Sequence, residues 1–180
     1  MARLIVLNGP PGIGKSTLAR RFVDDHPLTL ALEQDVVRGL LGGWRARETE
    51  SGLLARQLCI AMARMHLLGE RDVIVPQFIA LPAYLDQLAA VADEVQAAHV
   101  ELLLHDTAAE AERRFHARLQ NPLWAEHQRV AAQFIAEAGG YQAQYERLVR
   151  GIAGRPTQVI HSVDGDVDGT YVRLVAALSS

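Results

Sequence analysis

The residues best suited to do chemistry lie near the N-terminus, where the chain reads G-P-P-G-I-G-K-S from Gly9 to Ser16. This fits the pattern G-x-x-x-x-G-K-[ST], in which glycines let backbone N–H groups turn inward around phosphates at the start of a helix. The lysine of such a loop reaches the β- and γ-phosphates, and the hydroxyl after it coordinates Mg²⁺. We therefore predict a nucleoside triphosphate site that comprises Gly9, Gly12, Ile13, Gly14, Lys15, Ser16 and Thr17.

Two absences in the sequence narrow the class of nucleotide-dependent protein. Lys15 is the only lysine, so the N-K-x-D motif with which GTPases recognise guanine cannot occur, and ATP is the expected nucleotide. Motor-type ATPases usually carry an acidic residue at the end of an apolar strand, whereas the apolar run at 73–75 continues into Pro76 and Gln77. Small-molecule kinases, whose catalysis depends mainly on positioning and charge neutralisation, fit the sequence better.

A kinase also needs a group that accepts the proton of the substrate hydroxyl. Asp35 follows a short apolar run, where a carboxylate would face the γ-phosphate from the acceptor side and could act as a base and help to hold Mg²⁺. The alternative is that Asp35 only N-caps a helix that begins at Val36. Glu33, two residues earlier and on the same side of an extended strand, is the reserve candidate.

Phosphoryl transfer further requires positive charge over the transferring group. Arg114 and Arg118 are spaced i, i+4 on a predicted helix and so share one of its faces, with Arg113 adjacent. Their position after the fourth predicted strand favours a lid that closes over the γ-phosphate. A solvated helix face is the alternative.

The segments around these residues alternate between apolar strands and helices. We predict strands at 3–8, 28–32, 72–75, 100–104 and 157–161, and helices at 15–25, 35–41, 51–68, 82–96 and 170–178. A further helical stretch starts at Thr107, with breaks near 121–122 and 139–140. This alternation is typical of a mainly parallel sheet covered on both faces. We expect one three-layer α/β domain of P-loop kinase-like fold over 1–180, with acceptor-side helices at about 36–70 and a helical lid at about 107–140.

Composition excludes several other classes. The 180 residues are 49% hydrophobic and carry a net charge of −3, so the chain can bury a core and has no basic excess for a nucleic-acid partner. The single cysteine, Cys59, cannot form an internal disulfide and lies on an apolar helix, which predicts a core position. No apolar run has the length of a membrane span or the form of a signal peptide, so we expect a cytoplasmic protein. Apolar residues at 172–178 could make a weak peripheral membrane contact, although packing on the sheet is favoured, and the oligomeric state is left open.

The chain resembles the small-molecule kinase group that contains chloramphenicol phosphotransferase and the zeta toxins, through the P-loop, Asp35 and the arginine-rich helix. It is more similar to the bacterial tunicamycin-resistance ATP-binding proteins. The residues that carry this likeness are the segment I-V-P-Q-F-I-A-L-P-A-Y at 74–84, Arg114, Arg118 and the segment N-P-L-W-A at 121–125. The likeness covers nearly the whole chain.

The resemblance implies ATP binding and protection against tunicamycin, a nucleoside antibiotic that mimics UDP-N-acetylglucosamine, the compound that zeta toxins phosphorylate. The drug could be modified, or only bound and sequestered, and a kinase for an unrelated small molecule is a third alternative. Gln77 could hydrogen-bond a base or sugar, and Phe78 could either stack on the base or belong to the core. Arg38 could bind a diphosphate-like group, and Trp44 could stack on a uracil. The alternative is that these residues belong to a run of charged side chains exposed to solvent.

Overall fold

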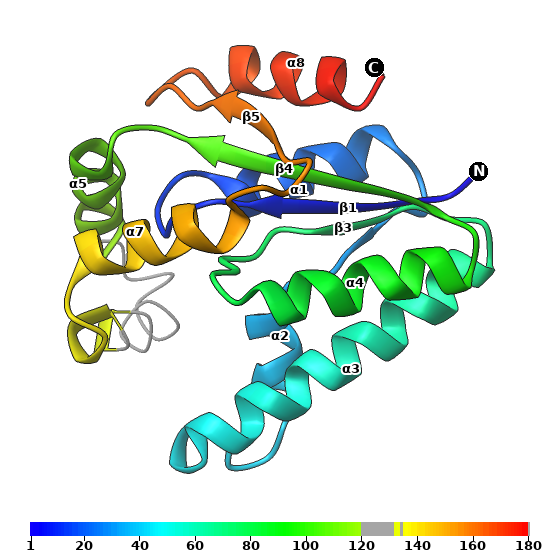
Figure 1. Ribbon diagram of the computed structural model, residues 1–180, viewed down its shortest axis with the longest axis horizontal. Helices are drawn as coiled ribbons and strands as arrows, with labels where there is room; N and C mark the ends of the chain where they lie inside the picture. The colour runs from blue at the N-terminus through cyan, green and yellow to red at the C-terminus, as the bar shows by residue number, and fades with distance from the viewer. Residues whose placement is uncertain (120–131, 134, 180) are drawn as a thin grey trace.

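A computed structural model describes residues 1–119, 132–133 and 135–179. The described residues form a five-stranded sheet in the order β2-β3-β1-β4-β5, in which every pair of neighbouring strands is parallel (Figure 1). The expected parallel sheet is therefore confirmed. Its strands are β1 (Arg3–Asn8), β2 (Leu30–Ala31), β3 (Val73–Val75), β4 (Ala98–His105) and β5 (Gln158–His161).

Helices cover both faces of this sheet, because the residues of its central strand alternate between two apolar cores. Leu4 and Val6 of β1 pack on the side of α2, α3 and α4, whereas Ile5 and Leu7 pack on the side of α1, α5 and α8. The three-layer arrangement is thus confirmed. The helices are α1 (Lys15–Asp25), α2 (Gln34–Gly39), the short η1 (Trp44–Ala46), α3 (Glu48–Leu68), α4 (Pro82–Glu94), α5 (Ala108–Leu119), α7 (Tyr141–Ile152) and α8 (Val167–Ala177).

Several predicted boundaries need correction. The strand predicted at 28–32 is limited to two residues, since Leu28 adopts a left-handed conformation with φ of 66° that interrupts extended backbone. Helix α2 begins at Gln34 with Glu33 at its N-cap, so Asp35 lies inside the first turn, and the alternative that Asp35 only N-caps this helix is wrong. Helix α3 begins three residues earlier than predicted, and α8 begins at Val167 because the Asp166 carboxylate caps it.

Two predictions about packing are confirmed. Cys59 is fully buried between α3 and the sheet, and this burial raises the pKa of its thiol to about 11. In the C-terminal helix, Tyr171 and Leu174 are buried against the core, so α8 packs on the sheet, with Val172 exposed. None of the described helices is long and apolar enough to cross a membrane.

Helix α7 approaches the segment after β3 so closely that one of its residues has no room for a side chain. A Cβ on Gly151 would lie 2.5 Å from the backbone oxygen of Ala80. We expect Gly151→Ala to lower the free energy of unfolding by about 1–3 kcal/mol, because backbone must move to relieve the overlap. Urea unfolding followed by circular dichroism measures this loss.

Gly52 provides the matched control, because it also lies in a helix but a Cβ added to it would enter open space. Gly52→Ala should raise the free energy of unfolding by about 0.5–1 kcal/mol through its helix propensity. Equal changes in the two variants would contradict the close approach of α7 to Ala80.

Candidate functional site

The predicted phosphate-binding loop connects the carboxyl end of β1 to α1, at the edge where ligands bind in open parallel sheets. Gly12 and Gly14 have φ of 87° and 104°, a region that favours glycine. A Cβ on Gly12 would also lie 2.7 Å from the backbone nitrogen of Phe115 in α5. Gly12 is therefore required both by its own backbone conformation and by the helix that lies against the loop.

Asn8, the last residue of β1, fixes the position of this loop relative to the segment after β3. Its side chain is buried, and its Oδ1 accepts hydrogen bonds from the backbone N–H groups of Gly9 at 2.8 Å and Ile79 at 2.9 Å. Its Nδ2 donates to the backbone oxygen of Ile79 at 2.9 Å. One amide thus joins the first residue of the phosphate loop to the segment that carries Gln77 and Phe78. Asn8 was not among the predicted site residues, although a polar residue that ends a buried strand just before a glycine was a usable signal.

Lys15 lies at the meeting point of the charged groups of the site. Its Nζ donates hydrogen bonds to the backbone oxygens of Gly9 at 2.8 Å and Pro10 at 2.9 Å. Burial, and then the nearby positive charge of Arg118, lower the pKa of Lys15 to about 7, while Asp35 and Glu33 act in the opposite direction. The predicted catalytic groups Lys15, Asp35 and Arg118 are therefore close enough to influence one another.

Glu33 makes the most direct contact with the predicted metal ligand. The Ser16 hydroxyl donates to Glu33 Oε2 at 2.7 Å, and Arg20 pairs with the other carboxylate oxygen at 3.5 Å. A hydroxyl and carboxylates are the hard oxygen donors that Mg²⁺ prefers. The residues present thus fit a Mg²⁺ site in which Glu33 joins Ser16 and Asp35, and the reserve candidate Glu33 lies nearer to Ser16 than expected.

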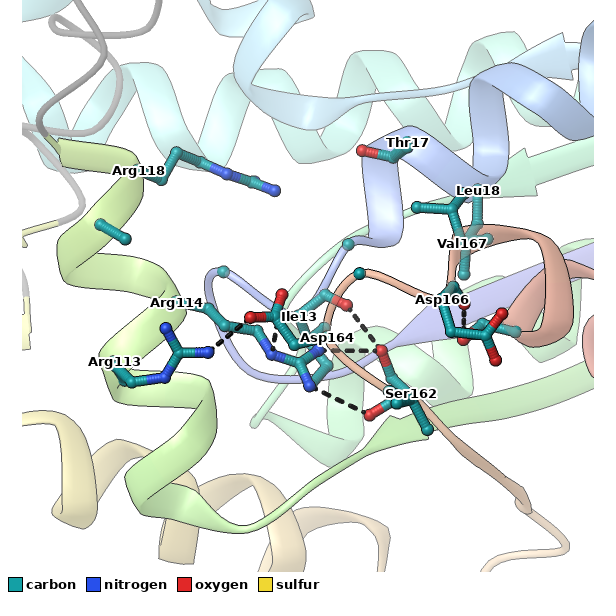
Figure 2. Close-up of a pocket in the computed structure, with 16 residues that line it drawn as sticks. Ile13, Thr17, Leu18, Arg113, Arg114, Arg118, Ser162, Asp164, Asp166 and Val167 are labelled. Atoms are coloured by element: carbon teal, nitrogen blue, oxygen red, sulfur yellow. Dashed lines mark hydrogen bonds and ion pairs between the residues drawn. The ribbon is translucent and has the colours of Figure 1, made fainter.

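An open cavity of about 220 Å³ adjoins the loop (Figure 2). Its walls come from the phosphate loop and α1, from α5, and from the segment between β5 and α8. Ser162 connects two of these walls, because its hydroxyl donates to the backbone oxygen of Ile13 at 3.1 Å. Polar and apolar side chains both line the cavity, as in many sites for small ligands. The lining residues include Ile13, Thr17, Leu18, Val163, Asp164 and Val167.

The two arginines expected to act together differ in their environments. The Arg114 side chain is 8% exposed, forms an ion pair with Asp106 at 2.5 Å, and donates to the hydroxyl and the backbone oxygen of Ser162 at 3.2 Å. Arg114 therefore holds the wall of the cavity in place. It is neither a residue of a lid that closes over the γ-phosphate nor part of a solvated helix face, the two alternatives that the sequence left open. Arg118 extends from α5 over the cavity toward Thr17 (Figure 2). Arg113 is 57% exposed and pairs with Asp164 at the rim.

The predicted acceptor-side residues fall into two groups. Gln77 and Phe78 are half-buried and lie next to the Asn8 contact, so Phe78 is not a core residue. Trp44 is buried, with the guanidinium groups of Arg38 and Arg45 at 5.0 Å and 4.8 Å from its ring centre. Arg38 donates to Ser51 and to the backbone oxygen of Glu48. Packing between α2 and α3 thus accounts for Arg38 and Trp44, which corrects the prediction that they face a diphosphate and a uracil.

The segment N-P-L-W-A at 121–125, which the resemblance places in the lid, lies outside the described residues. The lid predicted at about 107–140 can therefore be followed only through α5 and the described residues between 132 and 140. Directly after it Tyr141, at the start of α7, donates through its hydroxyl to the backbone oxygen of Pro11 at 2.6 Å. Helix α7 thereby touches the phosphate loop directly, which the sequence did not indicate.

Comparisons with known proteins agree with this geometry. A family model described as an AAA domain matches residues 4–150. No curated protein matches the sequence. Among solved structures, a gluconokinase from Sinorhizobium meliloti aligns with a TM-score of 0.64 at 19% identity, over 97% of this chain and 90% of that chain. The tunicamycin resistance protein of Deinococcus radiodurans aligns with a TM-score of 0.58 at 16% identity, over 99% and 95%. A Chloroflexus aurantiacus protein aligns with a TM-score of 0.67 at 15% identity, over 99% and 95%. At identities below 25%, these structural alignments show a shared fold.

The lowered pKa of Lys15 predicts that nucleotide binding takes up a proton. Free Lys15, with its pKa at about 7, is mostly neutral at pH 8, and phosphates would restore its charge by raising that pKa. ATP affinity should fall as pH rises above 7, by at most about tenfold per pH unit. Calorimetry at pH 8 in two buffers of different ionisation enthalpy measures the uptake. The Lys15→Arg variant keeps its positive charge at pH 8, so any ATP binding that it retains should occur without proton uptake. ATP binding without proton uptake by the unmodified protein would contradict the prediction.

The difference between Arg114 and Arg113 predicts a difference in stability. Arg114→Met leaves the Asp106 carboxylate buried without its counterion, which should lower the free energy of unfolding by about 3–5 kcal/mol. Arg113→Met removes only exposed ion pairs and should cost less than about 1 kcal/mol. Urea unfolding of both variants compares the two losses, and a similar small loss in each would show that Arg114 does not hold the cavity wall.

Proposed function

Since the chain belongs to the P-loop family whose model is described as an AAA domain, we propose that it is an ATP- and Mg²⁺-dependent phosphotransferase whose acceptor is a hydroxyl of tunicamycin or of a related uridine-sugar nucleoside. The observation that carries the proposal is the position of Lys15. Its ammonium lies in the phosphate loop and is influenced at once by Asp35, Glu33 and Arg118. A site for phosphoryl transfer needs cations around the phosphates and a carboxylate near the acceptor, and both are present here.

The phosphate loop supplies the donor side of the reaction. Backbone N–H groups of Gly12 to Ser16 and the ammonium of Lys15 hold the β- and γ-phosphates of ATP. When bound through Ser16 and the neighbouring carboxylates, Mg²⁺ neutralises charge on the phosphate oxygens. The cavity between the loop and the segment after β5 accepts the base, against the apolar side chains of Leu18 and Val167.

Asp35 and Glu33 divide the work of the acceptor side. Asp35 is exposed in the first turn of α2, where an incoming hydroxyl can reach its carboxylate, and it accepts the hydroxyl proton. Glu33 is bonded to Ser16 and is less accessible, so it orients the metal-binding hydroxyl. Arg118, which extends over the cavity, stabilises the charge that spreads over the transferring phosphoryl group.

The acceptor itself is proposed from the segment after β3. Asn8 holds this segment against the phosphate loop, so the half-buried Gln77 and Phe78 are available to hydrogen-bond a sugar or base and to stack on it. The resemblance of the sequence at 74–84 to tunicamycin-resistance proteins, and the shared fold with the Deinococcus radiodurans protein of that description, support a nucleoside antibiotic.

One observation favours a second function. Strand β3 ends at Val75 and is followed by Pro76 and Gln77, so the position where many P-loop proteins support the metal carries no acidic residue. A protein that binds the drug and ATP but transfers nothing would tolerate this. The shared fold with a gluconokinase likewise supports a third function, phosphorylation of an unrelated small hydroxylated molecule.

The first experiment is mass spectrometry of tunicamycin after incubation with the protein, ATP and Mg²⁺. We expect a mass gain of about 80 Da, one phosphoryl group, because a hydroxyl placed near Asp35 attacks the γ-phosphate. Asp35→Asn should keep ATP affinity within about threefold and slow the reaction by about 10²–10⁴-fold through loss of the base. Unchanged turnover in this variant would remove Asp35 from the mechanism.

Glu33→Gln separates the two carboxylates. It should raise the Mg²⁺ concentration needed for half-maximal rate, with a smaller effect on the rate at saturating Mg²⁺ than Asp35→Asn. If tunicamycin binds tightly but stays unmodified, the result would contradict the transfer reaction and support sequestration of the drug. If the drug neither binds nor changes, a panel of sugars and nucleosides tested in the same assay would identify the kinase substrate.

A further inference from the structure

Helix α3 has an apolar face that no described element of the chain covers. Its inner face packs on the sheet through Ala55, Cys59 and Ala63, which are fully buried. Its outer face nevertheless carries large apolar side chains that are between 37% and 69% exposed. Figure 1 shows α3 at the outer edge of the molecule, beyond α2 and α4. The exposed residues are Leu54, Leu58, Met62, Met65 and Leu68, with the small Ala61 among them, and we call this set the α3 face.

The α3 face contains no charge that would keep it in water. Between Leu53 and Leu68 the only ionised side chains are Arg56 and Arg64, and both turn toward α4: Arg64 pairs with Glu94 at 2.9 Å and Arg56 lies 5.7 Å from the ring centre of Tyr84. The other polar side chains of this stretch, the exposed Gln57 and the half-buried His66, carry no full charge. A helix with so broad an apolar surface is normally buried on more than one side. The composition of α3 therefore indicates a partner for its outer face.

The α3 face continues onto the neighbouring segment before β2. His66 donates through Nε2 to the backbone oxygen of Leu28 at 2.8 Å, which places Leu28 beside the C-terminal half of α3. Leu28 is 71% exposed and has φ of 66°. Leu28 thus extends the exposed apolar surface beyond the C-terminal half of α3.

The spacing of the α3 face indicates what kind of partner fits it. Residues 54, 58, 61, 65 and 68 follow one another at intervals of four and three, the repeat with which one helix packs along another. Their exposed parts amount to roughly 500 Å², so two copies of the face would bury about 1,000 Å², the lower bound for a specific interface. A membrane surface fits less well, because few cations flank the face.

We propose that the α3 face binds the same face of a second copy of this chain, with the two α3 helices antiparallel about a two-fold axis. In the register that packs Leu54 against Met65 of the other copy and Leu58 against Ala61, Glu50 falls opposite Gly69, the residue that follows α3. The Arg71 guanidinium lies beside Gly69, since a Cβ on Gly69 would be 3.4 Å from Arg71 Nη1, so Glu50 lies near Arg71 of the other copy. Glu50 and Arg71 are both exposed, and Glu50 also pairs with Arg47 of its own chain at 3.4 Å, so this register matches opposite charges at each end of the pair. The helix dipoles oppose each other in this arrangement, which is favourable. The assembly does not depend on which reaction the protein catalyses.

Sedimentation velocity at low and high micromolar concentration tests the assembly. We expect a reversible dimer, and Met65→Glu should weaken it at least tenfold, because a carboxylate would be buried opposite Leu54. Val172→Glu on α8 is the matched control, since Val172 is a similarly exposed apolar residue, at 66% against 69%, and should leave the dimer unchanged. Circular dichroism confirms that each variant is folded.

Charge reversal tests the antiparallel register without altering the apolar residues. Glu50→Arg alone and Arg71→Glu alone should each weaken the dimer several-fold, and the double variant should restore it. Failure of the double variant to restore association would overturn the register. A protein that stays monomeric at high micromolar concentration, or a dimer insensitive to Met65→Glu, would overturn the proposal. Monomeric protein that binds phosphatidylcholine vesicles through Met65 would overturn it in favour of a lipid surface.

Discussion

The buried amide of Asn8 is the constraint on which the rest of the site depends. It satisfies three backbone groups with one side chain, and these groups belong to two segments about seventy residues apart in the sequence. Because both its oxygen and its nitrogen are engaged, the amide has one orientation, and so the separation between the phosphate loop and the segment after β3 is fixed. A donor loop and an acceptor segment held at a constant separation are a precondition for in-line transfer between them.

The two buried cations near the phosphate loop, Arg114 and Lys15, have different partners. Arg114 is paired with Asp106 and is bonded to Ser162, which closes the wall of the cavity. Lys15 is held by backbone oxygens that cannot neutralise it, and its pKa falls because the ammonium is buried. The ammonium is therefore ready for an external anion, whereas the guanidinium of Arg114 is already satisfied. Lys15 is thus available to bind the ligand, whereas Arg114 stabilises the protein around the cavity.

The sequence was sufficient to predict the parallel sheet and the phosphate loop, because apolar strands, glycines and one lysine at fixed spacing leave few alternatives. It was insufficient where the outcome depends on tertiary contacts. The i, i+4 spacing assigned one role to Arg114 and Arg118, but Asp106 lies within reach of only the first. Trp44 looked like a ligand-stacking residue, and only the packing of α2 on α3 shows that it is buried. Asn8 read as the end of a strand, because its hydrogen-bonding partner Ile79 is distant in sequence.

The place of β1 in the sheet has a consequence for how the chain folds during synthesis. This strand is translated before both of its neighbours, yet it is the central strand, and Leu4 pairs with Val73 on one side and His99 on the other. One edge of this apolar strand thus stays unpaired until more than half of the chain has been translated, whereas α1 can form at once from local contacts. Nascent chains released before β4 would leave one edge of β1 without its hydrogen-bonding partner, which makes translation through this region the interval in which chaperone protection matters most.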